Sequence, residues 1–507
     1  MDAIAKHLAG FWRKFSKMIN SGVPILHALR VIRDETTDRG LAGAVESMRA
    51  GIESGRALSA TLEDHPSYFP PSVQTMVKAG ETTGRLDSVC AEIAQGLEDG
   101  TFGVEREAVD GAPPARDVAE VDPVPVKIVN DLLVAAYENR ASDIHIEWRT
   151  RDDMRVRYRV DGVLTENMAP EVPPDLRNAV ISRIKIMAGL NVAERRLPQD
   201  GRIMVTINEH PVDFRVSLVP YVTGESIVLR VLARDLALPR LDEIDLADEQ
   251  LTRLKSWCER PDGIIIVTGP TGCGKTTAIY SILMELNKPD RKIVTVEDPV
   301  EYMIEGVNQQ QANPGIGLTM AAALRAELRQ APNIMMVGEI RDLETANLVI
   351  QAALTGHLVL TTLHTNDAAG ALVRLLDIGV APFLVADTVV GVLAPRLLRK
   401  TCEHCREEYE PEQWMQDSLK RYGGNRFVRG RGCDKCHGGY RGRIQIHELL
   451  EPDGHIKKLI MRNASVEKIK DQAVKAGMTP LIQDGMAKAE AGMTTVEEVL
   501  RVCGTSR

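Results

Sequence analysis

The segment IIIVTGPTGCGKT, residues 264–276, carries the strongest structural signal in this sequence. Ile264–Val267 is a short, continuously apolar run, which is typical of a strand that is buried on both faces of a parallel sheet. The following residues, Gly269 to Thr276, have the G-x-x-x-x-G-K-[ST] spacing of a phosphate-binding loop. Because the loop follows a strand and opens a helix, it predicts an α/β fold with a nucleotide bound at the loop.

The residue types of this loop suit a phosphate ligand. Glycines let successive backbone N–H groups curl around a phosphate, and a helix N-terminus adds partial positive charge. Lys275 is expected to reach the β- and γ-phosphates, and Thr276 to offer its hydroxyl to Mg²⁺. The residues expected to hold the nucleotide are Gly269, Pro270, Thr271, Gly272, Cys273, Gly274, Lys275, Thr276 and Thr277.

Acidic and histidine side chains flank the strands predicted after the loop. Those strands are predicted at 293–296, 334–337 and 358–362, separated by helical stretches. Glu297 and Glu339 each follow a strand, and His357 and His364 bracket the last one. Ligands of an open parallel sheet bind at the carboxyl ends of its strands. We therefore expect these four side chains to gather near the loop.

The residues before the loop divide into three parts. Residues 1–103 have helical periodicity throughout and predict an all-α bundle. Residues 104–125 are acidic and contain prolines, which predicts a flexible linker. Residues 126–236 predict a small α+β domain, in which 154–160 alternates apolar residues with arginines before an Asp161-Gly162 hairpin turn.

Four of the eight cysteines form two C-x-x-C pairs, Cys402 with Cys405 and Cys433 with Cys436, separated by 27 residues. Four thiolates at this spacing suit a closed, structural Zn²⁺ site, and unligated thiols are the alternative. Nearby arginines also allow a zinc ribbon that binds nucleic acid. We predict a P-loop core at 237–396, a zinc subdomain at 397–445 and a helical subdomain at 446–507, in which Thr494 and Glu497 form a capping box.

The length and charge narrow the class of protein. A chain of 507 residues implies about three to four folding units. The formal net charge is 62 − 71 = −9, which argues against a bulk nucleic-acid binder. The longest apolar candidate, 379–395, is shorter than the ~18–20 residues that span a bilayer and contains Asp387. Together with the absence of a secretory signal pattern, this predicts a cytoplasmic, soluble protein.

From Ser142 onward the sequence resembles the ATPases of type II secretion and type IV pilus assembly. The resemblance implies a RecA-like P-loop domain, ATP as substrate, Mg²⁺ and Zn²⁺ as cofactors, and a homo-hexamer. The matching segments are SDIHIE (142–147), VRYRVDGVL (156–164), RLPQDGRI (196–203), VDFRVS (212–217), GPTGCGKTT (269–277), VTVEDPVEY (294–302), LRAELRQ (324–330), IMMVGEIRD (334–342), TGHLVLTTLHTND (355–367) and YRGRIQIHELL (440–450).

The resemblance also implies roles for single residues. Glu297 matches the family's catalytic glutamate, which acts as general base, and Glu339 matches the Walker B glutamate. His357 and His364 match histidines that sense the γ-phosphate. Arg202 and Arg215 match arginines that a neighbouring protomer presents to the nucleotide, where they stabilise transition-state charge.

The sequence departs from the family pattern at two positions. Cys273 stands where the family more often has Ser or Ala, and Asn333 stands where it often has an acid. A thiol at a helix N-terminus can be reactive, so redox gating is conceivable at Cys273, although a tolerated small residue is the favoured interpretation.

The first hundred residues resemble one cytoplasmic half of the inner-membrane platform protein of the same machines. The matching segments are SGVPILHALRVI (21–32), ESGRALSATLEDHPSYFPP (53–71) and MVKAGETTGRLD (76–87). This resemblance implies the platform and accessory secretion or pilus proteins as partners, with peripheral association at the inner membrane through them. The zinc subdomain would then be a docking surface for the platform.

These observations predict a hexameric Mg²⁺-dependent ATPase that powers pseudopilus or pilus assembly. The zinc cysteines favour assembly over retraction, because retraction members of the family usually lack them. Two alternatives stay open: a regulatory scaffold that binds ATP without hydrolysing it, and a nucleic-acid translocase. Binding of nucleic acid is not expected.

Overall fold

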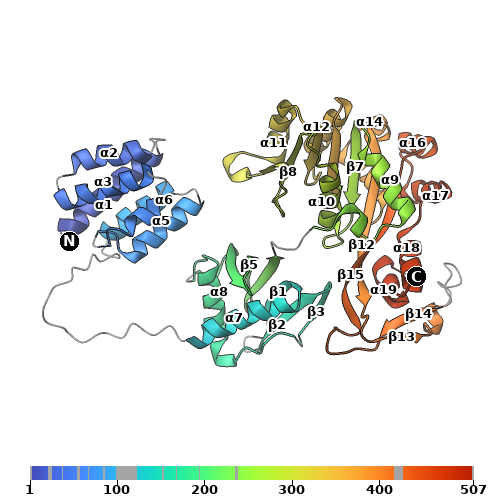
Figure 1. Cartoon of the computed structure of the whole chain (residues 1–507), viewed down its shortest axis with the longest axis horizontal. Coiled ribbons are helices and arrows are strands. Elements are labelled where there is room, and N and C mark those ends of the chain that lie inside the picture. The colour runs from blue at the N-terminus through green and yellow to red at the C-terminus, as the bar shows by residue number, and fades with distance from the viewer. Residues whose placement is uncertain are drawn as a thin grey trace. The chain divides into compact units, whose positions relative to one another are not determined.

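The computed structural model describes residues 3–20, 25–36, 38–53, 58–66, 68–83, 86–98, 123–150, 153–166, 168–192, 194–233, 238–415 and 426–504. The chain divides into two compact units, Met1–Val118 and Ala119–Arg507. The first unit is all-α in its described residues, and the second contains an α+β part followed by a P-loop domain of the α/β class, as predicted (Figure 1).

The described residues of the first unit form a bundle of six helices around its own core. Aromatic rings are scarce in this chain, at 4% of residues, yet four of them meet here, with neighbouring ring centroids 5.0–6.2 Å apart. Phe11, Trp12, Phe15 and Phe69 are each 3% exposed or less, so their burial holds α1 to the segment before α5. The helices are α1 (Ala3–Asn20), α2 (Ile25–Glu35), α3 (Arg39–Glu53), α4 (Leu58–Leu62), α5 (Pro71–Thr83) and α6 (Leu86–Glu98).

The α+β part begins with α7 (Pro123–Glu138). Its first turn takes in residues 123–125, which the linker prediction included, because proline is tolerated at a helix start. The rest of the predicted linker, 104–122, lies outside the described residues. A six-stranded antiparallel sheet follows, in the order β3-β2-β1-β6-β5-β4, and packs against α7 and α8 (Arg177–Met187). The strands are β1 (Ala141–Thr150), β2 (Asp153–Val160), β3 (Val163–Thr165), β4 (Gln199–Ile207), β5 (His210–Tyr221) and β6 (Gly224–Ala233).

Strand β2 confirms the predicted alternation. Its apolar side chains, such as Tyr158, are buried and its arginines are half-buried. Asp161 and Gly162 have positive φ angles of 48° and 86°, and they connect β2 to β3 as a two-residue turn. Glycine and aspartate tolerate this conformation better than most residues, so the turn lies where the sequence indicated.

The P-loop domain is built on a seven-stranded sheet in the order β15-β12-β7-β11-β10-β8-β9. Among the described strands, β12, β7, β11, β10, β8 and β9 run parallel, and β15 is antiparallel to β12. The strands are β7 (Gly263–Thr268), β8 (Ile293–Glu297), β9 (Asn308–Gln311), β10 (Ile334–Val337), β11 (Leu358–Leu363), β12 (Val389–Thr401) and β15 (Tyr440–Leu450).

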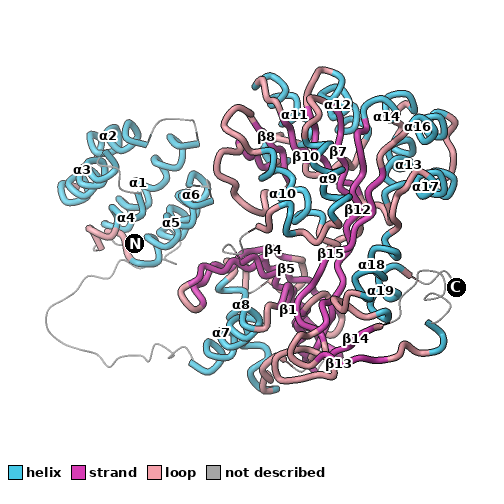
Figure 2. Tube along the Cα trace, turned by 45° about the vertical axis from the view of Figure 1, so that its right-hand side comes forward, coloured by secondary structure: helices cyan, strands magenta, loops and turns pink. Residues whose placement is uncertain are grey.

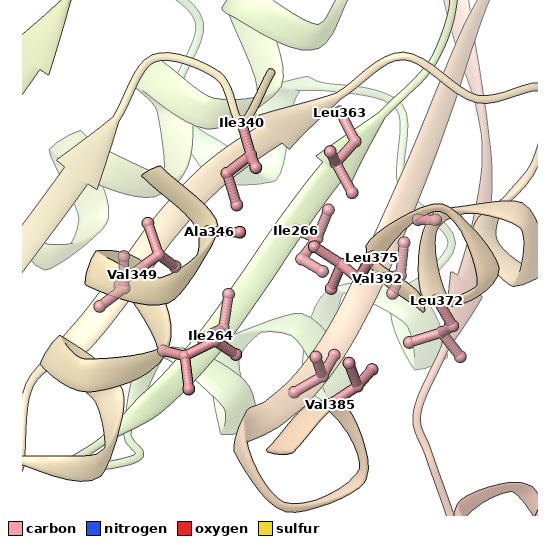
Figure 3. Packing of buried hydrophobic residues seen from close by; sticks show 14 of the residues in the cluster. Ile264, Ile266, Ile340, Ala346, Val349, Leu363, Leu372, Leu375, Val385 and Val392 are labelled. Atoms are coloured by element: carbon pink, nitrogen blue, oxygen red, sulfur yellow. The ribbon is translucent and has the colours of Figure 1, made fainter. Parts of the chain in front are cut away.

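Helices cover both faces of this sheet, which explains the continuously apolar strands (Figure 2). Ile264 and Ile266 of β7 face one layer of helices, and Figure 3 shows them packed with Val392 of β12 and Leu375. Ile265 and Val267 face the opposite layer. The helices of this domain are α9 (Asp248–Cys258), α10 (Lys275–Leu286), α11 (Met320–Glu327), α12 (Leu343–Leu354), α13 (Ala368–Ile378), α14 (Pro382–Thr388), α16 (Gly454–Met461), α17 (Val466–Lys475), α18 (Leu481–Glu490) and α19 (Val496–Cys503).

The cysteine-containing segment is an insertion between β12 and β15. It carries the two-stranded hairpin β13 (Arg406–Tyr409) and β14 (Phe427–Gly430), and residues 416–425 between them lie outside the described residues. The predicted boundaries at 396 and 445 fall inside β12 and β15, because these strands pair with each other along most of their length. Short 3₁₀ turns occur at Pro174–Leu176, Leu241–Glu243, Pro314–Ile316, Leu328–Gln330 and Gln413–Met415.

None of the described helices is both long enough and apolar enough to cross a bilayer. The apolar candidate 379–395 instead contributes α14 and the first half of β12. Its hydrophobicity therefore serves the core of the P-loop domain.

The last helix is capped one residue later than predicted. The N-cap of α19 is Thr495, whose side chain accepts a hydrogen bond from the Glu498 backbone N–H at 3.2 Å. Thr494 instead donates its hydroxyl to the carbonyl of Arg399 on β12. Both threonines satisfy the sequence pattern, and the neighbouring strand decides between them.

Glu498 is expected to make stability depend on pH. Burial alone would raise its pKa, but hydrogen bonds from Arg501 and Arg399 outweigh burial and lower the pKa from 4.5 to about 2. The ionised Glu498 therefore stabilises the folded protein fully above pH 4.5, and this contribution disappears as the pH falls toward 2. Glu498→Gln should cost about 3 kcal/mol at pH 7 and much less near pH 3, measured by urea unfolding with hydrogen exchange of α19. An equal cost at both pH values would contradict this assignment.

Candidate functional site

A cavity of about 800 Å³ lies at the carboxyl ends of the parallel strands. Its walls include most of the predicted phosphate loop, namely Thr271, Gly272, Gly274, Lys275, Thr276 and Thr277. Glu297, Glu339 and His364 line the same cavity. Of the four side chains expected near the loop, the structure therefore brings these three to the cavity.

The loop has the conformation that its glycines allow. Gly272 and Gly274 have φ angles of 77° and 98°, in the left-handed region that L-residues rarely adopt. A Cβ on Gly269 would lie 2.3 Å from the Cys273 sulfur, so the chain has no room for a side chain there. Cys273 is buried, and it fills the space beneath the loop.

Lys275, at the start of α10, lies across the loop. Its Nζ donates hydrogen bonds to the carbonyls of Gly269 at 2.6 Å and Pro270 at 3.1 Å. It also lies 3.5 Å from Nδ1 of His364. Burial lowers the pKa of Lys275, and the attraction of the Glu339 carboxylate offsets this effect only in part. An anionic ligand in the loop would stabilise the charged form.

Glu297 is held by three donors at the end of β8. Oε1 accepts hydrogen bonds from the Thr295 hydroxyl at 2.6 Å and from Nε2 of Gln309 at 3.1 Å. Oε2 accepts from the Tyr280 hydroxyl of α10. The residue is 3% exposed, so its carboxylate has one fixed orientation toward the cavity. Burial and the bond to Glu297 raise the pKa of Tyr280, which keeps the phenol a donor.

Glu339 follows β10 and forms a second polar cluster. Its carboxylate pairs with Arg341, and Oε2 lies 3.2 Å from Nε2 of His364. The pairing raises the pKa of Arg341, so this guanidinium remains charged. Because His364 also approaches Lys275, one imidazole connects the loop to the Walker B position.

The α+β part supplies the opposite wall of the cavity. Ser142, Asp143, His145, Arg159 and Arg230 line it. Asp143 lies 3.4 Å from Nε of Arg159 and 3.2 Å from Nε of Arg230, so one buried carboxylate pairs with two arginines. Sequence reasoning missed all three as site residues. The segment 142–147 on β1 and the alternating arginines of β2 marked the strands of Asp143 and Arg159, whereas no pattern marked Arg230 on β6.

The two arginines expected at a neighbour's nucleotide do not line this cavity. Arg202 on β4 donates to both carboxylate oxygens of Asp213 at 2.7 Å, and its side chain is 54% exposed. Arg215 on β5 lies 3.4 Å from Glu301, a residue of the cavity wall. The chain therefore keeps both arginines outside its own cavity.

His357 does not join the site. It precedes β11, and the residue after it, Leu358, pairs with Gly263 at the start of β7. The phosphate loop leaves β7 at the other end, so the full length of the strand separates His357 from it. Its Nδ1 instead contacts the carbonyl of Ala352 at 2.9 Å and Thr355. The sequence prediction grouped His357 with the residues at the carboxyl ends of the strands. It was wrong, because only His364 of the two histidines lies at that end.

The four C-x-x-C cysteines converge on one point. Their sulfur atoms all lie within 4.8 Å of one another, with contacts of 3.9, 3.7 and 3.6 Å for Cys402–Cys433, Cys405–Cys436 and Cys433–Cys436. A tetrahedral Zn²⁺ with Zn–S bonds of about 2.3 Å would separate its sulfurs by about 3.8 Å. Backbone N–H groups also donate to Cys405 and Cys436 sulfurs at 3.3 Å. The donor set and spacing therefore fit a tetrahedral metal.

Close backbone packing supports this cluster. A Cβ on Gly430 would lie 2.0 Å from the carbonyl oxygen of Gly439, and Gly439 itself has a φ of 86°. Cys402 donates its N–H to the same Gly439 carbonyl at 2.9 Å. The glycines bring the two cysteine loops together, which the cysteine spacing alone could not show.

A phosphate loop after a strand of a parallel sheet, with carboxylates at the carboxyl ends of other strands of that sheet, is typical of P-loop nucleotide hydrolases. The chain matches the family described as Type II/IV secretion system protein over residues 118–501. It belongs to this family, which contains the ATPases of type II secretion and type IV pilus assembly. Residues 11–101 match a second family, described as Type II secretion system (T2SS), protein F. Both predicted resemblances are confirmed.

Individual relatives support this assignment. The chain is 50% identical over 393 residues to the type II secretion system protein E of Xanthomonas campestris, covering 76% of this chain and 68% of that protein. It is 47% identical over 382 residues to the type IV pilus assembly ATPase PilB of Thermus thermophilus, covering 74% of this chain but 42% of that relative. The crystal structure of the ATPase DotB of Legionella pneumophila shares the fold, with a TM-score of 0.56 at 21% identity, covering 78% of this chain and 98% of DotB.

Proposed function

We propose that this chain is a Mg²⁺-dependent motor that hydrolyses ATP to power assembly of a pseudopilus or a type IV pilus. The observation that carries the proposal is the meeting of Lys275, Glu297, Glu339 and His364 in one cavity. Each of them reaches it from a different segment of the P-loop domain. Relatives named for type II secretion and for pilus assembly are about equally similar, so the proposal includes both machines.

The proposed chemistry is attack of water on the γ-phosphate. Lys275 would bind the β- and γ-phosphates, and Thr276 and Glu339 would hold Mg²⁺, which supplies charge neutralisation when bound. Glu297 would orient and deprotonate the attacking water as general base. His364 would report the γ-phosphate to Glu339, because its two ring nitrogens face Lys275 and Glu339.

We further propose a homo-hexamer in which the neighbour completes each site. Arg202 and Arg215 lie outside the cavity of their own chain, and Arg202 is more than half exposed. An arginine supplied from another protomer stabilises transition-state charge and makes turnover depend on assembly. Arg215 would exchange its contact with Glu301 for the partner's nucleotide.

We place the protein at the cytoplasmic side of the inner membrane, held there by partners. The match of residues 11–101 to the protein F family supports contact of the first unit with the membrane platform or its accessory proteins. The four-cysteine cluster would hold Zn²⁺ and present the β13–β14 hairpin as a docking surface. Nucleic acid has no role in this proposal.

A subunit-mixing experiment tests the shared site. Arg202→Ala and Glu297→Gln chains should each hydrolyse ATP at a few per cent of the wild-type rate or less. In an equal mixture, half of the chains carry Glu297 and half carry Arg202. About one site in four therefore combines an intact Glu297 with an intact Arg202 of its neighbour, and the mixture should recover about a quarter of wild-type phosphate release. Arg149→Ala, on the same sheet but paired with Glu166, is the matched control and should retain full activity. If mixing exchanges labelled subunits but restores nothing, Arg202 does not act across an interface.

A further inference from the structure

Arg396 is a buried arginine directly beneath the phosphate loop. It lies on β12 and is 7% exposed, but it does not line the cavity. Its guanidinium donates to the carbonyl of Pro395 at 2.6 Å and to the carbonyl of Asn366. No carboxylate of the described residues forms an ion pair with it, whereas Arg399 on the same strand pairs with Glu498.

This guanidinium contacts both loops that face the proposed phosphates. A Cβ on Gly269 would lie 2.5 Å from its terminal nitrogen, so the first glycine of the phosphate loop packs directly on Arg396. The carbonyl of the same glycine accepts the hydrogen bond from Lys275. Asn366, whose carbonyl accepts from Arg396, comes two residues after His364. One buried cation therefore lies behind both sides of the site.

A buried charge without a counter-ion is costly. Carbonyl oxygens offset part of the lost hydration, but removal of a guanidinium from water without a paired anion still destabilises the protein. Lys275 is a second cation, which donates to the carbonyl of the glycine that packs on Arg396, so its charge adds repulsion. An anion bound in the loop would offset both the unpaired charge of Arg396 and its repulsion from Lys275. The geometry of the loop fits a polyphosphate.

We propose that Arg396 is a positioning residue for the nucleotide phosphates, acting from behind the loop. Its hydrogen bonds and packing hold Gly269 and the segment after His364 at a fixed separation. Its positive charge raises the affinity for a nucleotide in proportion to the negative charge of the phosphates. The inference rests on the proposed binding of ATP at Lys275 and adds a residue that touches neither ligand nor cavity.

The test measures affinity for ATP and for ADP, each with Mg²⁺, in the full-length chain. Arg396→Met should weaken ATP binding about tenfold and ADP binding about threefold, because the lost attraction scales with ligand charge. Arg396→Lys keeps the charge and should bind ATP within about threefold of wild type. Without nucleotide, Arg396→Met should unfold at a temperature no lower than wild type, and nucleotide should raise that temperature less.

Arg399→Met is the matched control, since it removes a paired arginine three residues along β12. It should lower the unfolding temperature and leave the ratio of ATP to ADP affinity unchanged. Equal weakening of ATP and ADP by Arg396→Met, or a lowered unfolding temperature with wild-type affinity, would overturn the proposal. If Arg396→Met does not fold, a tenfold loss of ATP affinity in a folded Arg396→Lys would also overturn it. Failure of wild-type protein to bind ATP would instead refute the proposed function itself.

Discussion

Glu297→Gln is expected to lower kcat for ATP hydrolysis by about 10²–10⁴-fold while ATP still binds. The amide has the shape of the carboxylate but cannot accept a proton from the attacking water. Because Tyr280, Thr295 and Gln309 hold the native carboxylate in one orientation, the loss arises from chemistry, with little movement of the side chain. Phosphate release and nucleotide affinity, measured on the same sample, separate the two effects.

The control for this prediction is Glu305→Gln. Glu305 lies eight residues further along the chain, is exposed and does not line the cavity, so its variant should keep wild-type kcat. Tyr280→Phe removes one of the three donors and should lower kcat by a smaller factor than Glu297→Gln does. A Glu297→Gln enzyme with near wild-type turnover would remove Glu297 from the role of general base.

Loss of the cysteine cluster is expected to have the largest effect on folding. Structural zinc sites contribute apparent binding free energies of about 10–16 kcal/mol, which exceeds the stability of most domains. Cys436→Ser, or prolonged chelation, should therefore release one equivalent of zinc and unfold the insertion between β12 and β15. Metal analysis together with hydrogen exchange of β13 and β14 measures both outcomes.

Cys503→Ser is the matched control, because Cys503 lies outside the cluster and burial raises its pKa to about 12. It should keep the metal and the exchange protection of the hairpin. Purified protein without metal, in which β13 and β14 are still protected from exchange, would contradict a structural zinc site.

Local patterns predicted most of the framework. The apolar run at Ile264–Val267, the alternation along β2 and the turn at Asp161-Gly162 each depend on neighbours in sequence, so the residues themselves determined the outcome. Cysteine spacing likewise predicted the cluster, because each C-x-x-C pair brings two thiolates together before any long-range contact forms.

Most of the errors and omissions depend on contacts that sequence spacing cannot show. Thr494 and Thr495 fit a helix cap equally well, and the carbonyl of Arg399 selects between them. His357 precedes its strand and His364 follows it, so the predicted parallel sheet already placed only His364 at the carboxyl end. Arg159 reaches the cavity from β2, Arg230 from β6 in the middle of the same sheet, and Tyr280 from α10.

The sequence also contained no sign that Arg396 is buried behind the site. Arg396 stands in an apolar strand, where sequence reasoning assigns a charged residue to an exposed position. Its position beneath Gly269 follows from the parallel pairing of β12 with β7. A contact of this kind becomes visible only when the strand order is known.

The most direct test of the central claim is phosphate release from Mg²⁺-ATP by the purified full-length chain, compared with Lys275→Ala and repeated with added DNA. Steady release by the wild type, loss to background in Lys275→Ala and no stimulation by DNA are predicted. Nucleotide binding without release would instead indicate a regulatory scaffold. Release that depends on DNA, or that survives Lys275→Ala, would contradict the proposed motor.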